Sequence, residues 1–177
     1  MHNIFVSTTF TQDNTPISVV LRECIENGIT NVELGSNHSY EPDQEDTVKS
    51  YPGTYLVHNY FPIPKESFVV NIASFDDKIY ERSIRHVKTA IDFCQRIKAK
   101  LYTFHPGFLN DPKGSNKDNR NYDFEFKKTT ISSESYEQAF QRMLVAIREI
   151  VSYAQQRSVR IAIETEGSIS KKDYLLM

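Results

Sequence analysis

Three short apolar runs of this sequence each end in a side chain that can bind a metal. The three residues are His58, His105 and Glu164. If the runs are parallel strands, their downstream ends meet at one edge of a sheet. In a barrel of alternating strands and helices, active sites are built at that edge. Because imidazole and carboxylate together suit zinc, manganese or iron, the pattern predicts one shared metal site.

Each of these residues also has a simpler interpretation. A histidine at the end of an apolar run, such as His58, is often a hydrogen-bonded core residue. His105 is held at its strand end by the following Pro-Gly, which stops the strand abruptly. Glu164 ends a run apolar enough to be buried on both faces, where an unpaired carboxylate is costly. Glu166 is the competing acid, one strand period further on. Because the simpler interpretations of His58, His105 and Glu164 would all have to hold together, the occurrence of the three residues at strand ends favours the metal site.

Three more polar residues are candidates for substrate binding. Glu33 ends another apolar run and either faces a ligand or pairs with a lysine. His38 lies in the polar segment beyond it, where it is either solvated or in contact with substrate. Asn71 either caps the helix that follows or braces the loop that carries His58. His86 is expected at the surface.

The apolar periodicity predicts alternating strands and helices. Strands are expected at 4–9, 31–35, 55–58, 101–105 and 159–164, with 68–73 as a further extended candidate. Helices are expected over about 17–25, 80–94 and 136–156, with at most a short helix inside 36–54. Thr15 is the expected N-cap of the first helix, Gly28 its terminator, and Ser135 with Gln138 fits a capping box for the last.

This order of elements predicts the α/β class, a parallel (β/α) TIM-barrel type, with only the first five strands present. A complete barrel typically needs about 250 residues, so we expect 1–177 to be a single domain, the N-terminal part of a (β/α)8 barrel, truncated at its C-terminus. The segment 107–133 lacks apolar periodicity, and long loops of this kind are commonly lids or disordered.

The composition excludes some functions. A formal net charge of −2 gives no basic surface for nucleic acid, which we therefore do not expect as a partner. No apolar stretch reaches membrane-spanning length and no signal peptide opens the chain, so a cytoplasmic location is expected. Cys24 and Cys94 fall on apolar helix faces and are expected to be reduced core residues.

Five stretches resemble the xylose-isomerase-like TIM barrels, the superfamily of sugar phosphate isomerases/epimerases and endonuclease IV. They are His-Asn-Tyr at 58–60, Asn-Ile-Ala-Ser-Phe-Asp at 71–76, Arg-Ser-Ile at 82–84, Phe-His-Pro-Gly at 104–107 and Ile-Ala-Ile-Glu-Thr at 161–165. The likeness runs through nearly the whole chain and is best between His58 and Gly107.

The resemblance implies a divalent metal (Zn, Mn or Mg), no organic cofactor, and two ways to use the metal. In the isomerases and epimerases, the residue matching Glu164 binds one metal and serves near proton transfer, while the histidines line the pocket. In the endonuclease-IV-like enzymes, residues matching His58, His105 and Glu164 are zinc ligands of a three-metal cluster that cleaves DNA at abasic sites. Glu-Thr-Glu-Gly after the fifth strand, where the nuclease has Glu-Asn-Thr-Ala-Gly, favours the first.

We therefore expect a sugar or sugar-phosphate isomerase/epimerase, with Glu164 as catalytic residue and with His58, His105 and Glu164 as metal ligands. The full-length protein is the expected enzyme, and this chain alone is expected to be inactive. A metal-dependent phosphodiesterase acting on abasic DNA is the first alternative. The second is a non-catalytic fragment or partner-completed subunit, which would associate, for example as a homo-oligomer, through exposed sheet edges.

Overall fold

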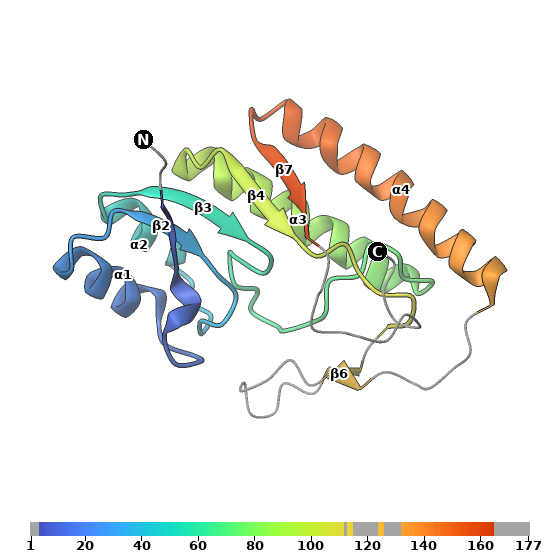
Figure 1. The fold of residues 1–177 in the computed structure, drawn as a ribbon, viewed down its shortest axis with the longest axis horizontal. Helices are drawn as coiled ribbons and strands as arrows, with labels where there is room; N and C mark the ends of the chain where they lie inside the picture. The colour runs from blue at the N-terminus through green and yellow to red at the C-terminus, as the bar shows by residue number, and fades with distance from the viewer. Residues whose placement is uncertain (1–3, 112, 115–123, 126–131, 165–177) are drawn as a thin grey trace.

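A five-stranded parallel sheet forms the centre of the computed structural model, which describes residues 4–111, 113–114, 124–125 and 132–164. The strands pair in chain order, as β1-β2-β3-β4-β7. Their bounds are β1 Val6–Ser7, β2 Asn31–Leu34, β3 Thr54–His58, β4 Leu101–Phe104 and β7 Arg160–Ile163. This is the parallel α/β sheet that the sequence predicted, and the strand arrows run to a common edge (Figure 1).

In the described part of the chain, four helices connect the strands and pack against the sheet (Figure 1). They are α1 Ile17–Glu26, α2 Gln44–Ser50, α3 Asp77–Ile97 and α4 Ser133–Gln155, with a 3-10 turn, η1, at Thr8–Phe10. Helix α3 packs on β3 and β4, and α4 packs on β7 and α3. Their apolar stripes and the buried strand residues make one continuous core, the dominant source of stability for such a domain.

The strand register separates two faces of the sheet. In β2, Val32 and Leu34 are buried in the core, whereas Glu33 between them is only half-buried. Partners in a parallel pair project to the same face, and the pairs include Glu33 with Leu56 and His58 with Thr103. One face therefore packs on the helices, and the other carries Glu33 and His58 together with Leu56.

The ends of α1 agree with the sequence prediction only in part. Gly28 has φ +71° and follows the helix, and the Ile29 N–H returns to the Cys24 carbonyl at 2.7 Å, as a glycine-terminated helix requires. Thr15 is not the cap, because its hydroxyl donates to the Gln12 carbonyl at 2.6 Å and the helix starts after a proline without a side-chain cap.

The predicted caps of the two long helices were also wrong. Asp76, and not Asn71, caps α3, with its carboxylate accepting from the N–H groups of the next turn. Helix α4 starts three residues earlier than predicted, with Ser132 as its N-cap accepting from the Ser135 N–H at 3.0 Å. Gln138 donates to the side chain of a glutamate in the first turn and forms no capping box.

Two predicted extended segments differ in the structure. The first strand keeps only two residues, because the chain turns into η1, where the Thr8 hydroxyl accepts the Gly35 N–H at 2.8 Å. Segment 68–73 is not a strand: residues 68–71 are irregular, and a turn follows at 72–73, where the Asn71 side chain accepts the Ala73 N–H. Strands β4 and β7 end one residue before His105 and Glu164, so both residues follow their strands.

Most of the segment 107–133, and Glu166, lie outside the described residues. Within it, β5 (Lys113–Gly114) and β6 (Phe124–Glu125) pair antiparallel. Both cysteines are free and buried in the core, as predicted. His86 was expected at the surface but is only 7% exposed on the inner face of α3. Among the described residues, no helix has the length and apolarity to cross a membrane.

Candidate metal centre

The sheet register brings the ends of β3, β4 and β7 to one place. His58 pairs with Thr103, which pairs with Ala162, so these three residues form a row across the sheet on one face. His105 and Glu164 each lie two residues beyond this row, where the period-two alternation of a strand returns the side chain to the same face. Three elements far apart in sequence therefore deliver polar side chains to one region.

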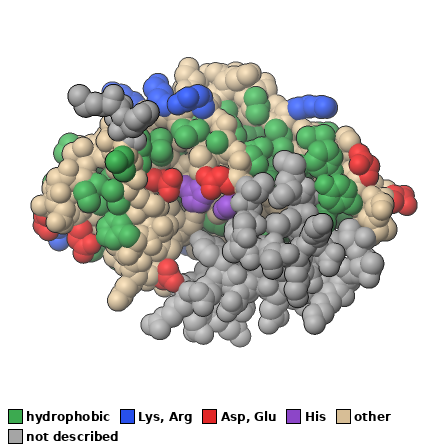
Figure 2. All heavy atoms as spheres, viewed as in Figure 1, with side chains coloured by type: hydrophobic (Ala, Val, Ile, Leu, Met, Phe, Trp, Pro, Cys, Tyr) green, Lys and Arg blue, Asp and Glu red, His purple; other side chains and the backbone are tan. Residues whose placement is uncertain are grey.

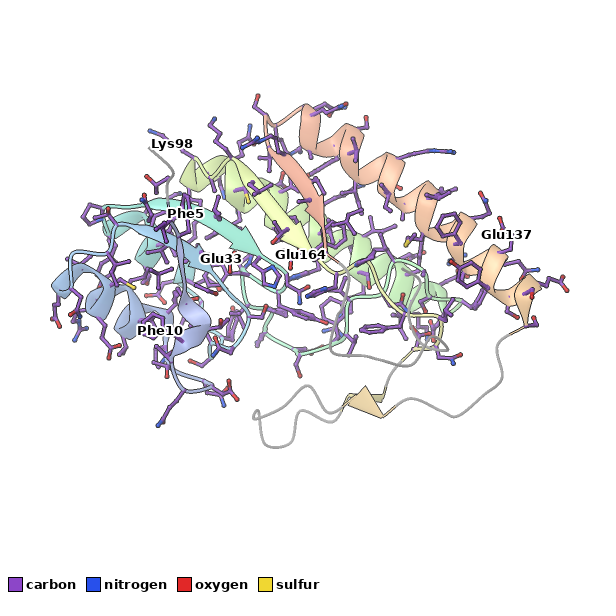
Figure 3. The ribbon with its side chains drawn as sticks, in the orientation of Figure 1. Phe5, Phe10, Glu33, Lys98, Glu137 and Glu164 are labelled. Carbon is purple, nitrogen blue, oxygen red and sulfur yellow. The ribbon has the colours of Figure 1, made fainter. Side chains whose placement is uncertain are left out.

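In that region the three predicted metal-binding side chains come together. One potential ligand atom from each of His58, His105 and Glu164 lies within 4.8 Å of the other two. The His58 Nδ1 atom is 3.6 Å from Oε1 of Glu164, and the two imidazoles meet edge to face with centroids 5.6 Å apart. Figure 2 shows histidine beside acidic side chains on this face, and Figure 3 labels Glu164 at the end of β7.

The cluster is open to solvent on one side. The side chain of His58 is 19% exposed, whereas that of Glu164 is 44% exposed. The histidine is therefore held by protein on most sides while the carboxylate can meet a small molecule. This asymmetry suits a site in which Glu164 touches substrate.

Backbone geometry orients His105. Its Nδ1 atom lies 3.2 Å from the main-chain oxygen of Glu164. A carbonyl oxygen only accepts, so Nδ1 carries the proton in this contact and the lone pair of the ring is on Nε2. Metal-binding histidines are commonly fixed in this way through their other nitrogen.

Thr103 plays the corresponding part for His58 and was missed by the sequence reasoning. Its hydroxyl lies 2.7 Å from Nδ1 of His58, and the residue is 9% exposed. The signal was available, because a hydroxyl two residues before His105 on a parallel strand shares the face of that histidine.

Asn71 braces the loop that follows β4, and it is 1% exposed. Its Oδ1 accepts the N–H groups of Ala73 and Phe108, at 3.0 and 3.1 Å. Its Nδ2 donates to the Phe108 carbonyl and, at 2.8 Å, to the carboxylate of Asp111. Both options considered for Asn71 from the sequence, capping α3 or bracing the loop with His58, were wrong. Contact of Asn71 with substrate stays a prediction.

Gly107 and Asp111 complete this brace. Gly107 has φ +142°, and a Cβ there would lie 2.1 Å from Oδ1 of Asn71. The other carboxylate oxygen of Asp111 accepts from the Ser74 hydroxyl at 2.6 Å. The Asn-Ile-Ala-Ser and His-Pro-Gly segments therefore fit together as one unit that fixes the chain next to His105.

His38 is buried at 4% exposure, so the expectation that it is solvated was wrong. Its Nδ1 donates to the Thr15 carbonyl at 3.0 Å, and its Nε2 accepts the Thr8 hydroxyl at 2.7 Å. Burial lowers the pKa of this imidazole, so the ring is neutral at pH 7. With both nitrogens engaged, His38 joins η1 and the start of α1 to the loop after β2.

Glu33 occupies the same face of the sheet from β2, and Figure 3 shows its place at the end of that strand. It is half-buried. It is not a member of the cluster formed by His58, His105 and Glu164 among the described residues. Contact with substrate therefore stays a prediction for Glu33.

The chemistry of the three clustered side chains fits a divalent cation. Bonds of about 2.1 Å place two ligands of one cation at most about 4.2 Å apart. One potential ligand atom of each residue lies within 4.8 Å of the other two, so small side-chain rotations would bring all three within this limit. Two imidazoles and one carboxylate leave further coordination positions for water or substrate.

A family model described as xylose isomerase-like TIM barrel matches residues 21–171. The chain belongs to this family. The matched range contains the three clustered residues and, wholly or in part, every described helix and strand after η1. A search of curated proteins found no match to the sequence.

Solved structures share the fold of this family member at low sequence identity. A D-tagatose 3-epimerase-like protein superposes with a TM-score of 0.63 at 15% identity, over 89% of this chain and 51% of its own. A 3-keto-D-glucoside 4-epimerase from E. coli superposes with a TM-score of 0.60 at 11% identity, over 97% of this chain and 57% of its own. A protein from Thermus thermophilus soaked with ZnCl2 superposes with a TM-score of 0.54 at 15% identity, over 90% of this chain and 54% of its own. The chain thus spans about half the length of these structures.

Proposed function

We propose that this chain provides the metal-binding part of a sugar or sugar-phosphate isomerase or epimerase. The convergence of His58, His105 and Glu164 at one sheet edge is the observation that carries the proposal. Family membership supports it, as do the structural neighbours, which include proteins named for 3-epimerase and 4-epimerase activity on sugars.

In this proposal the three clustered side chains hold one divalent cation, zinc, manganese or magnesium. The cation supplies an electrophile that polarises a substrate oxygen and lowers the pKa of a neighbouring C–H or bound water. The contact of His105 with the Glu164 main chain and that of His58 with Thr103 keep both imidazoles turned toward the common centre.

Glu164 moves the proton. One carboxylate oxygen lies next to His58, while the half-exposed side chain offers its other oxygen to a substrate. That oxygen takes the proton from a carbon beside the substrate carbonyl and, in an isomerase, returns it to the neighbouring carbon, whereas an epimerase would need a second acid on the opposite face of the substrate. Because the chain spans about half of the related structures, we expect turnover in a protein with the whole barrel and none from these 177 residues alone.

Calorimetric titration of the chain with Zn²⁺ and Mn²⁺ tests the proposal. We expect one ion per chain, and affinity weakened about tenfold or more in H105A and E164Q, because each removes a direct ligand. E26Q, which changes an exposed acid of α1, is the matched control and retains wild-type affinity. Absence of binding would overturn the proposal, and several zinc ions per full-length chain would favour the nuclease alternative.

A further inference from the structure

The chain turns directly after His58, the residue of the metal-binding cluster that ends β3. Asn59 has φ +49°, in the left-handed region that few residues other than glycine and asparagine adopt readily. Its N–H donates to the Thr103 carbonyl at 2.7 Å, and the Phe61 N–H closes the turn by donating to the His58 carbonyl at 3.1 Å. The backbone at Asn59 therefore fixes how the end of β3, and with it His58, is held.

Two buried side chains donate to the carbonyl oxygen of Asn59. The Tyr102 hydroxyl lies 2.7 Å from this oxygen, and Nε2 of His86 lies 3.4 Å from it. The shorter contact is the stronger hydrogen bond. Because Tyr102 belongs to β4 and His86 to α3, the turn is tied to two elements that are distant in sequence.

The hydroxyl of Tyr102 is not needed to fill the core. Tyr102 and Phe104 lie two residues apart on β4, are both fully buried, and stack with ring centroids 5.4 Å apart. Phe104 fills the core without a polar group, whereas a buried hydroxyl is costly unless it has a partner. Burial raises the pKa of Tyr102 well above its ordinary value, so the hydroxyl keeps its proton and donates to Asn59.

Strand β4 thus holds the end of β3 on both faces of the sheet. Thr103 projects to the face of the cluster, where its hydroxyl lies 2.7 Å from Nδ1 of His58. Tyr102, one residue earlier, projects to the opposite face and holds the carbonyl of Asn59. The first contact orients the imidazole, and the second fixes the backbone that carries it.

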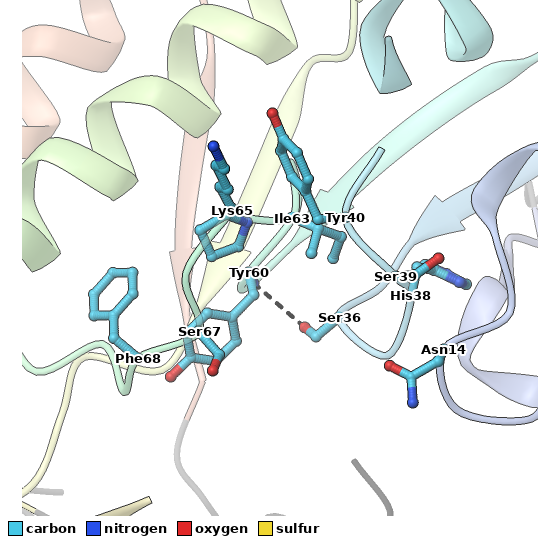
Figure 4. A pocket seen from close by; sticks show the side chains of 11 residues that line it. Asn14, Ser36, His38, Ser39, Tyr40, Tyr60, Ile63, Lys65, Ser67 and Phe68 are labelled. Carbon is cyan, nitrogen blue, oxygen red and sulfur yellow. Dashed lines mark hydrogen bonds between the residues drawn. The ribbon is translucent and has the colours of Figure 1, made fainter. Parts of the chain in front are cut away.

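The same turn joins the cluster to a pocket of about 330 Å³ between the loops that follow β2 and β3 (Figure 4). Tyr60, directly after Asn59, lines this pocket together with Phe68, and its N–H donates to the Ser36 hydroxyl at 3.3 Å. The rings of Tyr60 and Phe68 lie against His86, with centroids 5.8 and 5.6 Å away. The turn at Asn59 therefore also holds one wall of the pocket.

We propose that Tyr102 is a positioning residue of the metal-binding cluster: its hydroxyl holds the left-handed turn at Asn59 and thereby keeps the His58 imidazole directed at the common centre. The proposal rests on the proposed function for the role of His58 as a metal ligand. Tyr102 acts through the main chain, because its side chain lies on the other face of the sheet from the cluster.

Two tyrosine-to-phenylalanine variants of the 177-residue chain test the proposal. Y102F removes the hydroxyl that binds Asn59. Y55F removes that of Tyr55, a buried tyrosine of β3 whose hydroxyl donates to the Tyr51 carbonyl at 3.0 Å. Each variant loses one hydrogen bond to a main-chain carbonyl, so a general loss of stability affects both. We expect calorimetry to show Zn²⁺ affinity about tenfold weaker in Y102F, the lower end of the effect of an outer partner of a metal-binding histidine, and unchanged in Y55F. Wild-type affinity in Y102F overturns the proposal.

The metal-free protein gives a second readout that does not depend on zinc. NMR follows the ring signals of His58, which are sensitive to the His105 ring 5.6 Å away. We expect these signals to shift in Y102F and not in Y55F. Unchanged His58 signals in Y102F overturn the proposal whether or not zinc binds. A shift in Y102F together with no zinc binding by the wild type supports the positioning by Tyr102 and overturns only the proposed function.

A pair of variants at Asn59 tests the turn without altering Tyr102. Valine is strongly disfavoured at φ +49°, whereas glycine adopts it freely. The Oδ1 atom of Asn59 has no hydrogen-bond partner in the described part of the chain, so neither variant removes a bond of this atom. We expect N59V to bind Zn²⁺ about tenfold more weakly than N59G, because the strain is relieved by moving the turn. Equal affinities overturn the proposal, and this comparison also decides if Y102F does not fold.

Discussion

At the scale of single residues, the site depends on side chains that do not themselves reach a ligand. Thr103 contacts His58, and the Asn71–Asp111 brace holds the chain beside His105. These contacts fix which way each imidazole points, and orientation determines whether several ligands can share one ion. The predictions at this scale therefore concern supporting residues.

Replacing Thr103 with valine keeps the shape of the side chain and removes the hydroxyl. We expect metal affinity to fall about 10- to 100-fold, the usual effect of losing a partner of a metal-binding histidine. T103S retains the hydroxyl and should keep most of the affinity. Calorimetry measures both, and a valine variant that binds as tightly as wild type would show that Thr103 does not position His58.

Replacing Gly107 with alanine places a methyl group against Asn71 at a φ that side chains rarely adopt. We expect a loss of about 2–3 kcal/mol in the free energy of unfolding, measured with urea. Gly28 is the matched control: its φ is also positive, but a Cβ there meets nothing within 4 Å, so G28A should cost only about 1 kcal/mol. Equal losses in the two variants would contradict the role of the close contact.

At the scale of elements, the parallel pairing of strands determines which residues meet, and the helices decide what is buried. His86 illustrates the second point. It lies on the inner face of α3 with its Nε2 3.4 Å from the Asn59 carbonyl and its ring against Tyr60 and Phe68. Burial, opposed by that hydrogen bond and reinforced by the charge of Arg82, lowers the pKa of His86 to about 4.

This pKa predicts a loss of stability in mild acid. The unfolded chain takes up the proton of His86 near pH 6.5 and the folded chain only near pH 4, so stability falls as pH drops through this window and is unaffected by His86 above it. We expect His86 to account for about 2–3 kcal/mol of the loss between about pH 7.5 and about pH 4.5. Urea unfolding of wild type and H86Q at both pH values checks this, since all other titrating groups are common to the two. If the free energy of unfolding of H86Q fell between the two pH values as much as that of the wild type, the prediction would be refuted.

At the scale of the whole molecule, the cluster assembles ligands from β3, β4 and β7 and therefore exists only in the folded chain. A metal that binds the folded state and not the unfolded one must stabilise the fold. Zn²⁺ or Mn²⁺ at about 100 times its dissociation constant should raise the free energy of unfolding by about 2.7 kcal/mol. Denaturation with and without metal measures this. The same stabilisation in E164Q would show that the ion binds elsewhere.

Sequence alone determined the order of strands and helices, the parallel sheet and the three strand-end residues, because apolar periodicity and strand-breaking Pro-Gly are local signals. Tertiary structure decided what each polar residue does. His38 and His86 are buried, Asn71 braces a loop, and Asp76 and Ser132 cap the long helices. Burial and hydrogen-bond partners arise from segments distant in the chain, such as Thr8 with His38 and Asp111 with Asn71, and no local pattern encodes which of them meet.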